Sequence, residues 1–243
     1  MQQHRYAVFD IDGTLIRWQL YHAMADTLVK LGAIQKDEYT EVLSARMNWK
    51  NRQSINSFED YEQSLITLID RALPSIDHKL FVNACINVVD RYRDQVYTFT
   101  RDLIADLKRQ DYLLFAISGS PEELVGRVAE YYGFDDYVGT RYVFEANRFK
   151  NRGPTMFGPA KPKKLIELIN KYQAQTSGSI AVGDSAGDIG MLELAEKAIA
   201  FNPTRELLDH AIKRKWEIII ERKNVVYRLE DERGRYILKT TNG

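Results

Sequence analysis

The stretch Ala7-Val8-Phe9-Asp10-Ile11-Asp12-Gly13-Thr14-Leu15 is the most informative part of this sequence, because an apolar strand-like run ends there in two acids. Side chains two positions apart on an extended segment share a face. The carboxylates of Asp10 and Asp12 therefore repel each other unless a cation or a shared proton lies between them. The stretch predicts a metal site, a raised pKa, or both. An acidic turn that merely closes the strand is the structural alternative.

Further along the chain, short apolar runs rich in β-branched residues alternate with amphipathic stretches. This alternation is typical of parallel strands joined by crossover helices, so an α/β fold is expected. Nearly all-apolar strands indicate a sheet that is buried on both faces. The strand candidates are Tyr6–Phe9, Leu113–Ile117, Ile180–Val182, Ala198–Phe201 and Glu217–Ile220.

Residues 17–95 contain no convincing strand and are too long for one crossover. Apolar side chains recur there at three- and four-residue spacing, which predicts several helices. We therefore expect an inserted helical domain, residues 17–95, and an α/β core made of residues 1–16 and 96–243. Two hairpins are expected in the core, one around Ala146-Asn147 and one around residues 231–234.

The composition excludes several classes of function. Lys plus Arg equals Asp plus Glu at 34 each, so no global field attracts nucleic acid or an anionic membrane surface. Mean hydropathy is −0.39, and no apolar stretch approaches the roughly 18 residues of a membrane span. No apolar leader is apparent at the N-terminus, so the cytoplasm is the expected compartment. The single cysteine, Cys85, is expected in the core, and the four histidines lack zinc-ligand spacing.

A second strand candidate ends in Ser118-Gly119-Ser120-Pro121, followed by Glu123. Ser120 as the helix cap, with Glu123 three residues later, forms a capping-box pattern. That pattern leaves Ser118 without a structural task. Because Gly119 leaves its N–H approachable beside a helix start, Ser118 and Gly119 are candidates for holding an anion such as phosphate.

A third strand candidate ends in Gly183-Asp184, and Asp188 follows four residues later. Helix capping could explain Asp188 but not Asp184, whose place at the end of a buried strand indicates a metal ligand. Lys161 lies at the start of another helix, where its charge opposes the helix dipole. It therefore needs an anion nearby or points into solvent.

Taken in order, Asp10-x-Asp12-Gly-Thr, Ser118-Gly-Ser, Lys161 and Gly183-Asp184-Ser-x-x-Asp188 resemble the four motifs of the haloacid dehalogenase superfamily, in its phosphoserine-phosphatase-like branch. The resemblance covers nearly the whole chain except about the last twenty residues. It implies a doubly wound, mainly parallel Rossmann-like core with an inserted helical cap. It also implies a Mg²⁺-dependent phosphatase that hydrolyses a small phosphate monoester through an aspartyl-phosphate.

By this resemblance, Asp10 is the nucleophile and Asp12 the general acid and base. Mg²⁺ would be held by Asp10, Asp184 and the main-chain carbonyl of Asp12, with Asp188 positioning the site from beside it. The phosphoryl oxygens would be bound by Ser118, Gly119 and Lys161.

Two alternatives stay open. A phosphotransferase or mutase would use the same core with another acceptor, although Asp12 favours hydrolysis. A non-catalytic phosphate receiver would need neither Asp12 nor the insertion. The expected partner is a small phosphorylated molecule, and the sequence predicts neither an oligomeric state nor a role for residues 222–243.

The substrate-binding positions of the branch differ in this chain. Phosphoserine phosphatases hold the substrate's amino group with a Glu after the first motif and its carboxylate with an Arg on a later cap helix. Those positions fall at Gln19 and near Leu68, with Arg71 on the next turn as the alternative source of the positive charge. A neutral amide and an aliphatic side chain cannot supply this pair of charges, so phosphoserine is expected to be a poor substrate.

Overall fold

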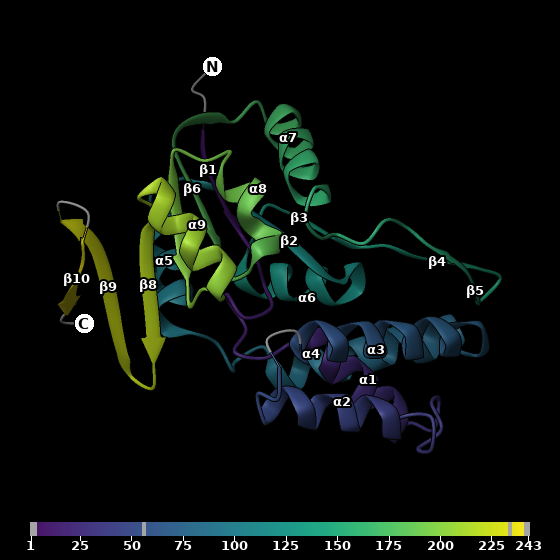
Figure 1. Ribbon diagram of the computed structural model, residues 1–243. Helices are drawn as coiled ribbons and strands as arrows, with labels where there is room; N and C mark the ends of the chain where they lie inside the picture. The colour runs from purple at the N-terminus through teal and green to yellow at the C-terminus, as the bar shows by residue number, and fades with distance from the viewer. Residues whose placement is uncertain (1–3, 55–56, 233–234, 241–243) are drawn as a thin grey trace. The chain divides into compact units, whose positions relative to one another are not determined.

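The computed structural model describes residues 4–54, 57–232 and 235–240. The chain divides into two compact units. The core unit comprises Met1–Gln19, Tyr92–Arg141 and Pro154–Gly243, and the helical unit comprises Leu20–Arg91 and Tyr142–Gly153. Figure 1 shows their elements along the chain.

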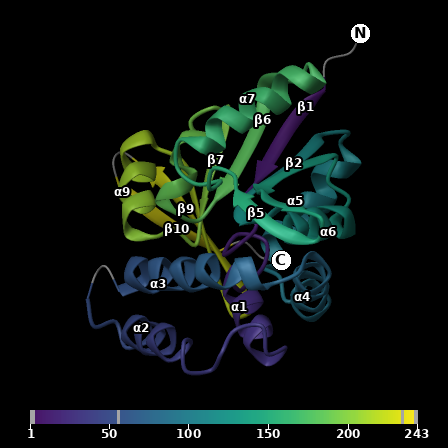
Figure 2. The same ribbon diagram turned by 90° about the vertical axis from the view of Figure 1, so that its right-hand side faces the viewer.

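The core unit contains an eight-stranded sheet of order β10-β9-β8-β7-β6-β1-β2-β3. Within this sheet, the neighbouring strands β8, β7, β6, β1, β2 and β3 are parallel. Strands β9 and β10 are added antiparallel at the β8 edge. The central strand β1 lies between β6 and β2 (Figure 2). The strands are β1 (Arg5–Phe9), β2 (Leu113–Pro121), β3 (Asp136–Thr140), β6 (Gln175–Gly183), β7 (Lys197–Phe201), β8 (Glu217–Arg222), β9 (Val225–Glu232) and β10 (Arg235–Thr240).

Helices cover both faces of the sheet, as the apolar strands require. On one face, Tyr6 and Val8 of β1 belong to a cluster that includes side chains of α7, α8 and α9. Alternate residues face the other way, where Phe9 contacts Phe134 after α6 and Phe201 stacks on Phe99 of α5. The helices are α5 (Thr98–Arg109), α6 (Glu122–Tyr132), α7 (Ala160–Tyr172), the short η2 (Ala186–Asp188) and α8 (Ile189–Leu192), and α9 (Arg205–Arg214).

The helical unit consists of α1 (Leu20–Lys30), α2 (Thr40–Lys50), α3 (Ser57–Ala72), the short η1 (Leu73–Ser75) and α4 (His78–Tyr92), with the hairpin of β4 (Tyr142–Glu145) and β5 (Arg148–Arg152). Phe81 of α4 packs against both Tyr142 and Phe144 of this hairpin. Within the described residues, no helix combines the length and hydropathy needed to cross a bilayer.

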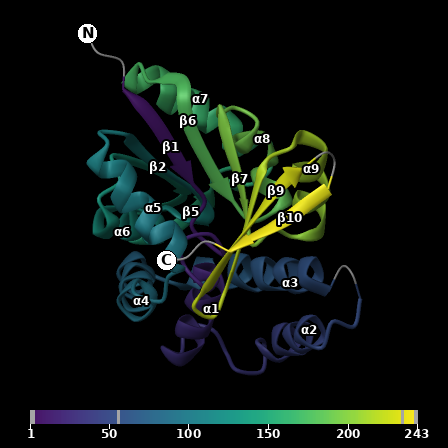
Figure 3. The ribbon, with the colours of Figure 1, turned by 90° about the vertical axis from the view of Figure 1, so that its left-hand side faces the viewer.

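The strands that the apolar runs predict are present, and the sheet is doubly wound around β1. Two details differ. The hairpin at 142–152 is grouped with the helices rather than with the core, because its aromatic face contacts α4. The second hairpin forms the edge of the sheet (Figure 3), although residues 233–234 of its expected turn lie outside the described residues.

Candidate active site

The acidic residues singled out above meet at the carboxyl ends of β1 and β6. Strand order reverses around β1, since the chain continues to β2 on one side and later to β6 on the other. In doubly wound sheets, ligands bind in the crevice at such a switch point. Asp10 follows β1 directly, and its N–H donates to the carbonyl of Val182 in β6 at 3.0 Å. The backbone itself therefore joins the first and last acidic motifs.

A buried lysine connects two of the acids. The Lys161 Nζ lies 2.6 Å from Asp10 Oδ1 and 2.6 Å from Asp188 Oδ1. Asp10, Lys161 and Asp188 are 4%, 3% and 0% exposed. The alternative in which Lys161 points into solvent is therefore wrong. Because breaking such a buried pair leaves an unpaired charge, each of the three side chains holds the others in place.

The carboxylate of Asp188 is fully engaged. Its Oδ2 accepts from the N–H groups of Asp184 and Ser185 at 3.1 and 3.0 Å and from the Ser185 hydroxyl at 3.0 Å. Ser185 and Asp188 form a capping box for the short helix η2. The capping explanation of Asp188 is therefore correct, and the same carboxylate also binds Lys161.

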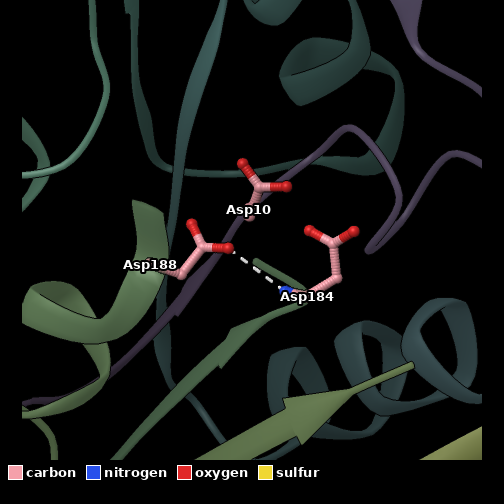
Figure 4. A group of neighbouring side chains, drawn as sticks. All are labelled: Asp10, Asp184 and Asp188. Carbon is pink, nitrogen blue, oxygen red and sulfur yellow. Dashed lines mark hydrogen bonds between the residues drawn. The ribbon is translucent and has the colours of Figure 1, made fainter. Parts of the chain in front are cut away.

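Asp184 completes an acidic cluster. One carboxylate oxygen each of Asp10, Asp184 and Asp188 lies within 4.8 Å of the others (Figure 4). Gly13 has φ +83°, and a Cβ there would lie 2.3 Å from Asp184 Oδ2. The glycine of the first motif is thus required both by its backbone conformation and by the close approach of Asp184.

Burial dominates the electrostatics of this cluster. It raises the pKa of Asp10 to about 7, with Asp188 and Asp12 adding to the rise and Lys161 opposing it. Burial and the neighbouring Asp10 also raise the pKa of Asp184 well above its usual range. Burial alone would lower the pKa of Lys161, but the charges of Asp10 and Asp188 outweigh it, so the pKa is raised and the lysine stays charged.

The cluster fits a divalent cation. Asp10, Asp12, Asp184 and Asp188 bring four carboxyl groups to this edge of the sheet, and Lys161 supplies one positive charge among them. All the donor atoms are hard oxygens, which suit Mg²⁺ better than soft metals. Both oxygens of Asp188 already accept hydrogen bonds, whereas Asp10 and Asp184 each keep one oxygen that accepts none from the described residues, so these two side chains are the better ligands for an ion.

The end of β2 brings the hydroxyl motif to the same place. The Ser118 hydroxyl donates to Asp12 Oδ2 at 2.7 Å and accepts the N–H of Ser120 at 3.0 Å. The capping box predicted for Ser120 is wrong: β2 continues through Pro121, and the helix that follows has no side-chain cap. The buried Ser120 hydroxyl forms no hydrogen bond with any residue that the structure describes.

Sequence reasoning missed a residue that supports this loop. The hydroxyl of Thr140, at the end of β3, donates to the carbonyl of Gly119 and accepts the N–H of Met156 at 3.1 Å. It thereby ties the Ser118 loop to the segment that leads into Lys161. No local motif marks Thr140, because its partners are distant in sequence.

A doubly wound parallel sheet with a paired-acid loop and a buried Lys–Asp network at its switch point defines an α/β protein with a cluster of oxygen ligands suited to a cation. More particularly, the chain belongs to the haloacid dehalogenase-like hydrolase family, whose model matches residues 7–193.

Two phosphoserine phosphatases are among the similar proteins. The one from Archaeoglobus fulgidus is 27% identical over 86% of this chain and 56% of its own length, and the one from Streptomyces coelicolor is 27% identical over 82% and 44%. The chain therefore spans about half the length of these relatives.

Solved structures share the fold. A Bordetella pertussis protein of unknown function superposes with a TM-score of 0.71 at 17% identity, over 90% of this chain and 99% of that one. A phospho-aspartyl intermediate analogue of phosphoserine phosphatase gives 0.63 at 22% identity, over 92% and 96%.

Proposed function

We propose that this protein is a Mg²⁺-dependent phosphatase that hydrolyses a small phosphate monoester through an aspartyl-phosphate. The observation that carries the proposal is the buried Asp10–Lys161–Asp188 network beside Asp184. Lys161 holds one oxygen of Asp10, so the other oxygen has a defined direction. The names of the relatives from Archaeoglobus fulgidus and Streptomyces coelicolor agree with this chemistry.

In the first step, the free oxygen of Asp10 attacks phosphorus and the ester P–O bond breaks. Asp12 gives a proton to the departing oxygen, so the alcohol leaves neutral. Such proton transfer contributes roughly 10²–10⁴-fold to the rate. Splitting a slow hydrolysis into two substitutions lowers each barrier.

In the second step, Asp12 takes a proton from water as the water oxygen attacks phosphorus. The bond between phosphorus and Asp10 then breaks, which releases phosphate and restores both acids. Ser118 donates to Asp12 in the structure. Turning this hydroxyl toward a phosphoryl oxygen frees Asp12 for proton transfer.

The phosphoryl oxygens would be held by the Ser118 hydroxyl, the N–H of Gly119 and the ammonium of Lys161, which neutralise charge as it develops. Asp10, Asp184 and the main-chain carbonyl of Asp12 would hold Mg²⁺, which supplies further charge neutralisation when bound. Asp188 orients Lys161 and the Asp184 backbone. The role of the helical unit as a cap remains part of the proposal.

The test is phosphate release from a panel of simple esters such as p-nitrophenyl phosphate. We expect turnover with Mg²⁺ and none with excess chelator, restored when Mg²⁺ is added back. Trapping with a labelled ester should show phosphate on the protein, and hydroxylamine should release it. Full activity in chelator would contradict a metal at Asp10 and Asp184. Transfer to an added alcohol in preference to water would favour a phosphotransferase.

A further inference from the structure

A second polar group of residues lies next to the acidic cluster, where the chain leaves and re-enters the core unit. The outgoing segment Leu15–Arg17 pairs with the returning segment Gln95–Tyr97: Arg17 N donates to Gln95 O at 2.8 Å, and Tyr97 N donates to Leu15 O at 3.0 Å. This pairing begins one residue after Thr14 of the first motif. The positions of Arg17 and Tyr97 are thereby coupled to the catalytic loop.

Arg17 carries an uncompensated charge. Its side chain is exposed, and the guanidinium carbon lies 5.7 Å from the centre of the Tyr97 ring. No carboxylate among the described residues forms an ion pair with it. A guanidinium over an aromatic face keeps its N–H groups available at its edges, so Arg17 can still bind an anion.

Tyr97 lies near Asp184 of the acidic cluster. Its ring meets Phe201 edge-on, with centroids 4.9 Å apart, which fixes the ring plane. The hydroxyl lies close enough to Asp184, Arg17 and Glu221 for all three charges to act on it, and it lies beside the side chain of Asn202. The Glu221 carboxylate is already engaged by the N–H groups of Thr98 and Phe99. A phenolic hydroxyl here can donate a hydrogen bond to a ligand.

Asn202 supplies a third donor. It follows β7 with φ 44°, and its Oδ1 accepts the N–H of Glu221 at 2.8 Å, so the amide orientation is determined. Its Nδ2 is buried and lies beside the Tyr97 hydroxyl, without a hydrogen bond of good geometry to any described residue. Two residues later, Thr204 N donates to Asp184 O at 2.8 Å. A buried donor without an acceptor is costly unless something else accepts from it.

We propose that Arg17, Tyr97 and Asn202 form a subsite for an anionic group carried by the leaving group of the substrate, either a carboxylate or a second phosphate. Three donors from three separate segments meet there, and an anion is the ligand that accepts from all of them. The proposal rests on the phosphatase function and narrows its substrate class to phosphate esters with a second negative charge.

Three esters of equal carbon number test the subsite: propyl phosphate, 3-phosphooxypropanoate and propane-1,3-diol bisphosphate. We expect kcat/KM for at least one anionic ester to exceed that for propyl phosphate at least about tenfold. Whichever anionic ester is favoured identifies the carboxylate or the phosphate as the preferred group. Equal kcat/KM for all three would overturn the proposal.

The variant Arg17→Gln should lower the ratio of anionic to neutral kcat/KM at least about tenfold, chiefly through KM, and Arg17→Lys should restore part of it. Tyr97→Phe should lower the ratio less, since it removes one neutral donor. Arg101→Gln is the matched control, because it removes the same charge from an exposed arginine that pairs with Asp102. An unchanged ratio in Arg17→Gln, or an equal drop in Arg101→Gln, would overturn the proposal.

The two proposals can fail separately. Turnover of propyl phosphate without an anionic preference would remove the subsite but keep the phosphatase. If no ester is hydrolysed, the phosphatase function fails. Calorimetry with 3-phosphooxypropanoate then tests the subsite on its own. The subsite predicts that Arg17→Gln binds this compound more weakly than Arg101→Gln does, and equal binding would overturn it.

Discussion

Asp10 has two tasks in the proposed reaction, since one carboxylate serves both as the nucleophile and as a metal ligand. Asp10→Asn keeps the shape of the side chain but removes its charge, so it should abolish aspartyl-phosphate formation and lower kcat by more than about 10⁴-fold. Phosphate release and labelling by beryllium fluoride measure the two effects. Thermal unfolding would show whether the variant is folded, and a folded variant with ordinary activity would contradict the covalent mechanism.

Asp184 and Asp188 differ in what they touch, although both belong to the acidic cluster. Asp184→Ala should raise the Mg²⁺ concentration for half-maximal activity at least tenfold, because the proposed ion loses a ligand. Asp188→Ala removes one of the two carboxylates that hold the buried Lys161 and leaves two backbone N–H groups without their acceptor, so it should lower stability by about 3–5 kcal/mol. Magnesium titrations and urea unfolding of both variants separate the roles. An equal shift in magnesium requirement would make Asp188 a ligand.

The sequence located most of this site because its residues follow strand ends, and the ends of parallel strands meet at one edge of a sheet. Strand ends indicated Asp10, Ser118 and Asp184, whereas Lys161 lies at the start of a helix and was placed with them only by the resemblance to the haloacid dehalogenase motifs. Ser120 shows the limit of such reasoning. Its local pattern satisfies a capping rule, yet pairing with β3 extends β2 through Pro121, and tertiary contacts decide the outcome.

Among the elements, α5 shows how the fold places the returning segment. The buried carboxylate of Glu221 in β8 accepts the N–H groups of Thr98 and Phe99 at 3.0 and 2.9 Å. It caps the helix from more than a hundred residues away, so no local sequence signal predicts it. The Thr100 hydroxyl in the same helix donates to Thr14 O at 2.9 Å. The start of α5 thus holds the loop of the first acidic motif directly.

In the helical unit, α1 carries a buried histidine that should make stability depend on pH. His22 is 1% exposed and meets the Tyr61 ring at 4.6 Å between centroids. Burial, aided by the charge of Arg46, lowers its pKa from 6.5 to about 3. The unfolded chain therefore binds more protons than the folded one between these values, so stability is full above pH 6.5 and falls as the pH drops toward 3.

At pH 5 this linkage should cost about 2 kcal/mol relative to neutral pH. Urea unfolding at pH 7 and pH 5 measures this loss. The variant His22→Phe keeps an aromatic ring among the same neighbours, so its free energy of unfolding should fall by about 2 kcal/mol less than that of the unmodified protein between these two pH values. NMR titration gives an independent check, since the imidazole should remain neutral in the folded protein down to about pH 4. Protonation near pH 6 without unfolding would contradict the assignment.

Strand β3 is the element that the apolar pattern did not predict. Its residues Asp136–Thr140 are only partly buried, because it lies at the edge of the sheet beside β2. A half-exposed edge strand lacks the continuous apolar run by which the buried strands were found. Thr140 at its end was missed because its partners are distant in sequence, although its side chain holds the carbonyl of Gly119.

For the molecule as a whole, the long strandless interval predicted a separate helical unit. The interval could not show that a segment from a distant part of the sequence also belongs to this unit. The hairpin of β4 and β5 returns to that unit from the later half of the chain. It does so through packing, with His78 stacked on Phe144 at 4.7 Å and Arg152 paired with Asp70 at 3.2 Å. Contacts between segments so distant in sequence leave no periodic signal.

The substrate preference of the whole protein should differ from that of the relatives named for phosphoserine. Gln19 is a half-buried neutral amide and Leu68 is a buried aliphatic side chain, so neither position can pair with the charged amino or carboxylate group of phosphoserine. An ammonium group that loses its water without gaining a carboxylate costs binding free energy. We therefore expect kcat/KM for phosphoserine at least about tenfold below that for 3-phosphooxypropanoate, which lacks only the ammonium group. Steady-state phosphate release with both compounds, within a broader panel of esters, measures this difference. A value for phosphoserine equal to that of the best compound in the panel would contradict this expectation.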